Sequence, residues 1–276
     1  MPGDPHPSPL SGGRLAGHIG GFWLGYLVIL AVCGLLKGLF PPRIAPLIWG
    51  GVSTLGLFGM TFWLLRREGR TAERVGLQGS AASLRRFVAG LLLGVAVYST
   101  MLLAISLIAG PLEVSRAVRP TGLALLTVVA TTLALGAMEE VGFRAYPLMT
   151  LVESLGKWWG QLIVAVAFAL THILYGWSFS TVALGVFPSA LLFGATAVVT
   201  RGIACPLGVH VALNLGQWAM GEKGESGLWL ITLGSGSEDK VAAVAPIIGF
   251  TVVTLSAIAV LFGSKWHASR TIDKAA

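Results

Sequence analysis

The sequence predicts an all-α, polytopic membrane protein of about eight transmembrane helices with a polar site inside the membrane. Composition is the first observation behind this fold class: 55% of the 276 residues are hydrophobic and only 11% are charged, whereas a soluble domain carries about 25% charged residues. The second is a mean hydropathy of +0.80. The third is a series of apolar runs, each near the roughly 20 residues that a spanning helix needs. A soluble enzyme and a disordered chain are therefore excluded.

The apolar runs follow one another along the chain and predict a single transmembrane domain over residues 18–263. Residues 1–17 contain four prolines and are expected to form a disordered tail, and residues 264–276 a second tail. The first run is too long for the hydrophobic part of a typical signal peptide, so we interpret it as a span. The expected spans are 18–38, 44–65, 87–110, 121–150, 159–177, 182–200, 203–221 and 241–263.

Two details of these runs bear on helix geometry. The run 121–150 exceeds 25 residues, so this helix should be tilted, kinked or extended beyond the bilayer. The spacings Gly17-Gly21-Gly25 and Gly90-Gly94 would each allow a neighbouring helix to approach closely, although a few such spacings are expected by chance among 37 glycines. We assign no function to the segment 222–240, which is long for a loop of this topology.

The distribution of basic residues predicts the orientation of the spans. The formal charge of +7 would suit nucleic-acid binding, but in a polytopic membrane protein basic residues gather in cytoplasmic loops. The loop between the second and third spans holds six arginines against two glutamates and should be cytoplasmic. With eight spans, both termini are then cytoplasmic, and twelve Lys and Arg residues fall on that side against six on the other. No nucleic-acid partner is expected.

Ionisable residues within a span are costly to bury and are therefore functional candidates. Glu139 and Glu140 lie together in the fourth run with Arg144 four residues beyond Glu140. That spacing places Glu140 and Arg144 on one helix face, where they can pair. Glu139 is rotated by about 100°, so it is free to act on another group. A purely structural ion pair is the alternative.

Two further polar sets lie on other spans. Phe168 precedes His172 by four residues in the fifth run, and His210 precedes Asn214 by four in the seventh. A buried carboxylate suits general-base catalysis near neutral pH. His172 could orient the same water, and His210 with Asn214 could donate hydrogen bonds to an oxyanion. Together these groups predict water-mediated amide hydrolysis in the cytoplasmic half of the membrane.

A metal site is the competing interpretation. Glu139, His172 and His210 could together hold zinc or a similar divalent ion. However, the sequence has no H-E-x-x-H helix, and the guanidinium of Arg144 would compete with a cation beside the carboxylates. Cys33 and Cys205 lie in apolar runs and provide no ligand set. We therefore favour hydrolysis without a metal or other cofactor.

The three motifs resemble those of the CPBP family, the group of CAAX proteases and of bacteriocin-processing and immunity (Abi) proteins. The family pattern is E-E-x-x-x-R, then F-x-x-x-H, then H-x-x-x-N, and this chain carries all three in that order between Glu139 and Asn214. The resemblance covers about residues 121–221, which we expect to form the catalytic core. It implies an intramembrane glutamate-type endopeptidase similar to the Ras-converting CAAX endopeptidases.

The resemblance also implies roles for individual residues. Glu139 would be the general base on water, assisted by His172, and Glu140 would be held by Arg144. His210 and Asn214 would form the oxyanion hole, and Phe168 would pack beside the site. The expected partners are the lipid bilayer and a membrane-anchored or lipidated protein, prenylated or not, cut near its C-terminus.

Two alternatives from other functional classes remain open. One is a non-catalytic immunity or partner-binding membrane protein of the same family. The other is a proton-coupled transporter that uses the buried Glu and His residues as a relay, although no inverted repeat supports it. The sequence names neither the substrate nor the oligomeric state.

Overall fold

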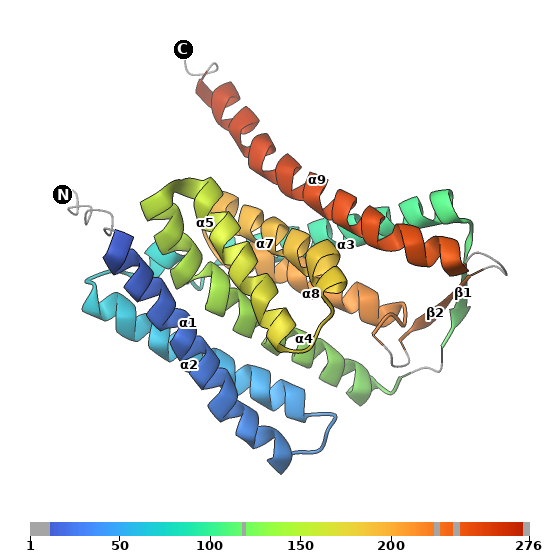
Figure 1. Cartoon of the computed structure of the whole chain (residues 1–276), viewed down its shortest axis with the longest axis horizontal. Coiled ribbons are helices and arrows are strands. Elements are labelled where there is room, and N and C mark those ends of the chain that lie inside the picture. The colour runs from blue at the N-terminus through green and yellow to red at the C-terminus, as the bar shows by residue number, and fades with distance from the viewer. Residues whose placement is uncertain (1–11, 118–119, 224–226, 234–237, 273–276) are drawn as a thin grey trace.

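The computed structural model describes residues 12–117, 120–223, 227–233 and 238–272 (Figure 1). Nearly all of them are helical, as predicted, and in this part of the chain six helical segments are long and apolar enough to cross a membrane. One of the six, Gly122–Leu174, contains two consecutive helices, and a further helix of 16 residues, Ala204–Ala219, is shorter than any of the six segments. The chain is thus an integral, multi-pass membrane protein.

The helices follow the expected spans closely. Residues 1–11 of the predicted N-terminal tail lie outside the described residues, but the first helix already begins at Gly12, six residues before the expected span. The last helix continues past residue 263, through part of the expected C-terminal tail. The helices are α1 (Gly12–Gly34), α2 (Ala45–Arg67), α3 (Ala81–Ala109), α4 (Gly122–Arg144), α5 (Tyr146–Leu174), α6 (Phe179–Thr181), α7 (Phe187–Thr200), α8 (Ala204–Ala219) and α9 (Glu238–Ile272).

The expected single span over 121–150 is in fact two helices. Thr121 caps the start of α4, because its hydroxyl accepts a hydrogen bond from the backbone N–H of Ala124 at 3.2 Å. The helix ends at Arg144, because Ala145 leaves the helical conformation with φ −76° and ψ −103°. Pro147 then lies in the first turn of α5, where a missing N–H costs nothing. The long run is therefore broken directly after the E-E-x-x-x-R motif.

Helix α5 is itself kinked. Gly156 has φ +80° and ψ +165°, a conformation that glycine adopts without strain. The segment after the kink carries Phe168 and His172 back into the bundle. The chain then turns at residues 175–178 and returns through α6, a π-helical turn η3 (Val182–Val186) and α7.

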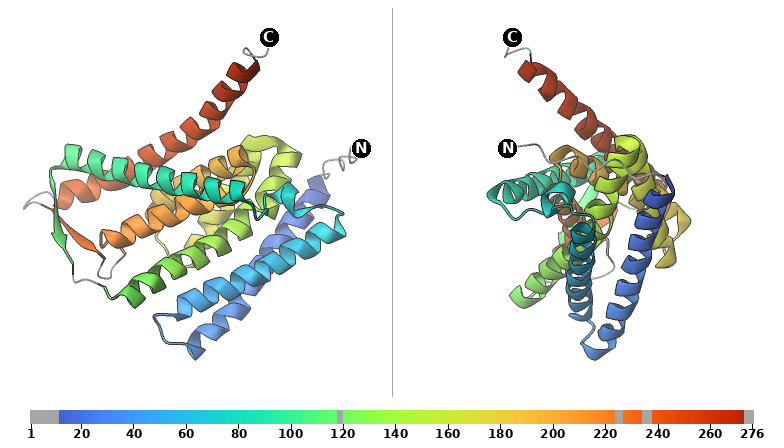
Figure 2. Two further views of the ribbon diagram at one scale, coloured as in Figure 1. Left: turned by 180° about the vertical axis from the view of Figure 1, so that it is seen from behind. Right: turned by 90° about the vertical axis from the view of Figure 1, so that its left-hand side faces the viewer.

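The two ends of the bundle differ. Figures 1 and 2 show the start of α1 at the end opposite a small two-stranded sheet, and α9 runs away from that sheet. The sheet pairs β1 (Leu112–Arg116) with β2 (Trp229–Leu233) in antiparallel register. This short β structure was not expected in an all-α chain. It occupies part of the 222–240 segment and joins it to the end of α3.

Close packing of α3 against α8 forms the most extensive helix–helix contact among the described elements. Glycines on both helices make it possible: Gly90 and Gly94 lie against α8, whereas Gly17 and Gly21 of the other expected spacing have open space around them. A Cβ on Gly90 would lie 2.1 Å from the carbonyl oxygen of Cys205, and one on Gly208 would lie 2.2 Å from that of Phe87. These backbones therefore touch only because neither position has a side chain. The contact holds α8, with His210 and Asn214, against the rest of the bundle.

Candidate active site

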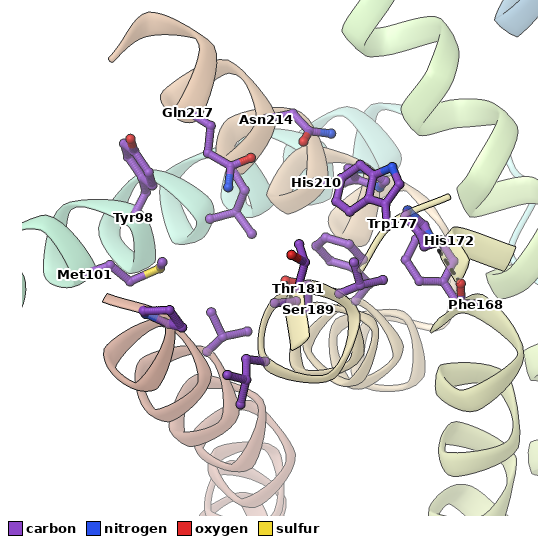
Figure 3. Close-up of a pocket in the computed structure, with 18 of the residues that line it drawn as sticks. Tyr98, Met101, Phe168, His172, Trp177, Thr181, Ser189, His210, Asn214 and Gln217 are labelled. Carbon is purple, nitrogen blue, oxygen red and sulfur yellow. Dashed lines mark hydrogen bonds between the residues drawn. The ribbon is translucent and has the colours of Figure 1, made fainter. Parts of the chain in front are cut away.

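A cavity of about 530 Å³ lies among α3, α4, α5, α7, α8 and α9. Four of the residues that the sequence singled out, Glu139, His172, His210 and Asn214, line it. Figure 3 shows His172, His210 and Asn214 projecting into the same space from α5 and α8. Helices that are far apart in the sequence thus bring the polar groups together. The volume is within the range of about 300–1,000 Å³ that is usual for ligand sites.

Glu140 and Arg144 lie behind the cavity wall, not in its lining. Both side chains are fully buried, and Nη1 of Arg144 is 3.4 Å from Oε1 of Glu140. Aromatic rings surround the guanidinium, which lies 4.2 Å from the ring centroid of Phe168 and 5.3 Å from that of Phe193. Attraction between a cation and an aromatic face at these distances is favourable. The pairing expected from the i, i+4 spacing is therefore present, and Phe168 packs beside it.

His210 stands between the two glutamates. Its Nδ1 is 2.9 Å from Oε1 of Glu140, and its Nε2 is 3.6 Å from Oε2 of Glu139. The ring of Phe193 stacks on the imidazole with 4.6 Å between centroids. Glu140 thus holds two partners, Arg144 and His210. The sequence motif showed the first but not the second, since the second depends on how α8 packs on α4.

His172 is held by the backbone of its own helix. Its Nδ1 lies 3.0 Å from the carbonyl oxygen of Phe168. A carbonyl oxygen only accepts hydrogen bonds, so Nδ1 carries a proton, and Nε2 is the nitrogen that can accept a hydrogen bond when the ring is neutral. The rings of Phe168 and Trp177 pack against it, with centroids 4.7 and 5.1 Å away. This arrangement suits a histidine that accepts a hydrogen bond from water.

Asn214 has a partner that the sequence did not suggest. Nζ of Lys223 donates a hydrogen bond of 2.6 Å to its Oδ1, and Lys223 also lines the cavity. The only available signal was a basic residue nine positions after the last motif residue, which is weak. Other lining residues that the sequence did not single out are Tyr98, Trp177, Thr181, Ser189 and Gln217.

The candidate metal ligands do not form a cluster. Among the described residues, no three His, Cys, Asp or Glu side chains are grouped so that they could hold a metal ion. Glu139, His172 and His210 nevertheless surround one cavity, and each histidine directs Nδ1 to a protein acceptor, as metal-binding histidines also do. The arrangement instead places a carboxylate, two imidazoles and an amide around a space that a peptide bond and a water molecule could fill.

Residues 121–216 match the family described as "Type II CAAX prenyl endopeptidase Rce1-like". The matched range runs from the residue before α4 into α8 and contains all six predicted site residues. No curated protein gives a significant match to the chain.

Proposed function

We propose that the protein is an intramembrane glutamate-type endopeptidase. The match of residues 121–216 to the Rce1-like family of CAAX prenyl endopeptidases supports this proposal, and it agrees with the resemblance of the three motifs. It would hydrolyse a peptide bond near the C-terminus of a membrane-anchored protein whose C-terminal region is prenylated or otherwise lipidated. The family is a protease family; the glutamate mechanism and the substrate are our proposals.

One observation carries the proposal: a single cavity brings Glu139 together with His172, His210 and Asn214. Glu139 is 15% exposed, so water can reach its carboxylate from the cavity, whereas Glu140 is fully buried. This difference supports separate roles for the two adjacent carboxylates. Glu139 acts on water, and Glu140 orients His210.

The first step is attack of water on the scissile carbonyl. The carboxylate of Glu139 takes one proton from the water while Nε2 of His172 accepts a hydrogen bond from it. The water oxygen forms a bond to the carbonyl carbon, and the π-electron pair moves to the carbonyl oxygen. The resulting oxyanion accepts hydrogen bonds from Nδ2 of Asn214 and from Nε2 of His210 when that nitrogen carries a proton.

The second step is collapse of the tetrahedral intermediate. The C=O bond re-forms, the C–N bond breaks, and its electron pair stays on the nitrogen. Glu139 returns its proton to that nitrogen, so the carboxylate is regenerated. The products are a new C-terminal carboxylic acid on the anchored part and a free amine on the released peptide. The remaining proton of the water leaves when that acid ionises.

The walls of the cavity support a lipidated substrate. Apolar side chains from α3, α7 and α9, among them Met101, Phe193 and Val253, form an apolar part of the cavity lining. An apolar chain attached near the cleavage site would bury its surface there at a gain of about 25 cal/mol per Å². We propose that this wall receives the lipid or the apolar side chains next to the scissile bond.

Replacement of Glu139 tests the proposal. We expect E139Q to lower the cleavage rate of a farnesylated CAAX peptide in detergent or liposomes by about 10²- to 10⁴-fold, because the general base is lost. Glu73 is exposed on the loop between α2 and α3, so E73Q is the matched control and should cleave at the wild-type rate. An unprenylated peptide of the same sequence tests the lipid preference. Wild-type activity in E139Q would refute the mechanism.

The non-catalytic alternative makes the opposite prediction. If the protein is an immunity factor or a scaffold, its biological effect will survive E139Q combined with H172A. If it is a protease, comparison of membrane-protein C-termini between wild-type and E139Q cells will reveal shortened proteins only in the wild type.

We also propose that both termini and the Glu139 end of α4 face the cytoplasm. The charge distribution supports this orientation. Glu139 lies five residues before the end of α4, about 8 Å at 1.5 Å per residue, and is therefore close to that end of the helix. Single cysteines introduced at the exposed residues Gly79 and Lys240 should react with an impermeant reagent from opposite sides of the membrane. Labelling of both from one side would contradict the topology.

A further inference from the structure

Lys223 is the only lysine or arginine among the described residues that line the cavity. Glu139 is the only carboxylate in the same lining. Lys223 lies beyond the three motifs and outside the range matched by the family. No carboxylate of the described residues forms an ion pair with it within 4 Å; its one hydrogen bond there goes to the amide of Asn214. A cation in this position calls for an explanation that the motifs do not supply.

The backbone reverses after α8 and brings Lys223 back to Asn214 on that helix. Gly221 has φ +76°, so the backbone reverses there. The N–H of Glu222 then donates to the carbonyl oxygen of Gln217 at 2.9 Å. The carboxylate of Glu222 accepts a hydrogen bond of 2.5 Å from the hydroxyl of Tyr98 on α3. Contacts to two helices therefore fix the residue next to Lys223.

The chemistry of the two groups fixes the direction of the Asn214 amide. An ammonium group has three donors and no acceptor, so it can bind only the oxygen of a side-chain amide. With Oδ1 occupied by Lys223, the NH₂ group of Asn214 stays available as a donor. An oxyanion requires a donor of this kind.

We propose that Lys223 is a positioning residue of the oxyanion hole, which holds Asn214 with its NH₂ group available to the substrate and places a positive charge beside the developing negative charge. This inference rests on the proposed function. It adds a residue to the reaction that the motifs do not contain, and it gives the segment after α8 a role.

The electrostatic surroundings of Lys223 agree with this placement. The side chain faces the open cavity, yet the cavity walls lower its pKa by desolvation, while the charges of Glu139 and Glu222 oppose that shift. The other titratable groups that line the cavity are Tyr98 on α3, Glu139 on α4, His172 on α5 and His210 on α8. The described lining residues of α7 and α9 carry no titratable group. The charges of Lys223 and of Glu139, the proposed general base, therefore influence each other.

Three variants test the proposal in the full-length protein. K223M keeps the length of the side chain but removes its charge and donors, and we expect it to lower kcat by about 10- to 100-fold with little change in KM. K223R keeps both and should recover most of the rate. Lys240 is an exposed lysine at the start of α9, so K240M should match the wild type. A wild-type kcat in K223M, with normal expression and Tm, would overturn the inference.

A double-mutant cycle separates a positioning role from direct contact with substrate. If Lys223 acts in large part through Asn214, K223M will lower kcat less in the N214A background than in the wild type. Full additivity of the two effects would overturn the inference.

The dependence of kcat on pH is a second test. A lysine with a purely structural role would not change the pH at which kcat falls. The wild-type kcat should fall as the pH rises through the lowered pKa of Lys223 and the ammonium charge is lost. K223R keeps its charge at high pH, so its alkaline limb should lie at higher pH. If kcat falls at the same alkaline pH in the wild type and in K223R, the proposed role of Lys223 is wrong.

The two proposals fail in different ways. Absence of any cleavage that depends on Glu139 would refute the proposed function, and the role of Lys223 with it. Cleavage that depends on Glu139 but not on Lys223 would refute the inference alone.

Discussion

The buried pair of Glu140 and Arg144 allows structural and catalytic carboxylates to be told apart. The sequence places Glu139 and Glu140 side by side, but only Glu140 is fully buried and bonded to both Arg144 and His210. We predict that E140L lowers stability strongly, whereas E139Q lowers activity with little loss of stability. The reason is that E140L leaves the guanidinium of Arg144 buried without a counter-charge.

The magnitude follows from the burial. Removing one partner of a buried ion pair costs about 3–5 kcal/mol. A change of 1 kcal/mol corresponds to about 2–4 °C in a domain of some 150–250 residues, so Tm should fall by about 6–20 °C. Replacing both charged residues, as in E140L combined with R144M, removes the unpaired charge and should restore most of the lost stability. Glu153, whose side chain is 36% exposed in its ion pairs, is the control, and E153Q should cost at most about 1 kcal/mol.

Thermal unfolding of the purified variants in detergent micelles measures these differences. The reasoning would be refuted if E140L unfolded within about 2 °C of the wild type. It would also be refuted if the double variant were less stable than E140L, since the cost would then come from lost packing and not from the unpaired guanidinium.

Three further predictions concern packing, the loop between α2 and α3, and metal dependence. We expect G208A to lower both Tm and activity, because the new Cβ would lie 2.2 Å from the carbonyl oxygen of Phe87, whereas Gly17 has open space around it and G17A should be harmless. R70M should lower Tm by several degrees, since Arg70 is only 6% exposed and bridges Glu68 to α5; R66M is its exposed control. Treatment of the purified protein with a strong chelator should leave the cleavage rate unchanged, and a loss restored by zinc would contradict the proposed mechanism.

The sequence predicted most of the fold because the bilayer imposes a simple rule. Backbone groups in lipid must be satisfied within the segment, so apolar runs of sufficient length become helices. The rule does not show where a helix breaks inside a run. The expected span 121–150 ends at Arg144 because of the conformation of Ala145, and neither hydropathy nor length encodes that change. The antiparallel pairing of β1 with β2 also escaped prediction, because it joins segments more than 100 residues apart.

The sequence predicted those members of the candidate site that are charged or polar, because such side chains are costly to place in a membrane and are therefore rare in the apolar runs. Glu139, Glu140 and Arg144 are conspicuous in a chain with 11% charged residues, and the two histidine motifs lie at helical spacing on separate runs. The sequence by itself therefore determined which residues are candidates, because burial of charge in lipid is tolerated only with a partner or a function.

Only the tertiary structure decided how these residues are arranged. The packing of α8 on α3 and α4 places His210 between two carboxylates, and the turn at Gly221 brings Lys223 back to Asn214. These contacts depend on crossing of helices and on one reversal of the backbone, and local sequence spacing carries no information about either. Spacing along one helix is set by its 3.6-residue repeat, whereas the approach of two helices depends on every side chain packed between them.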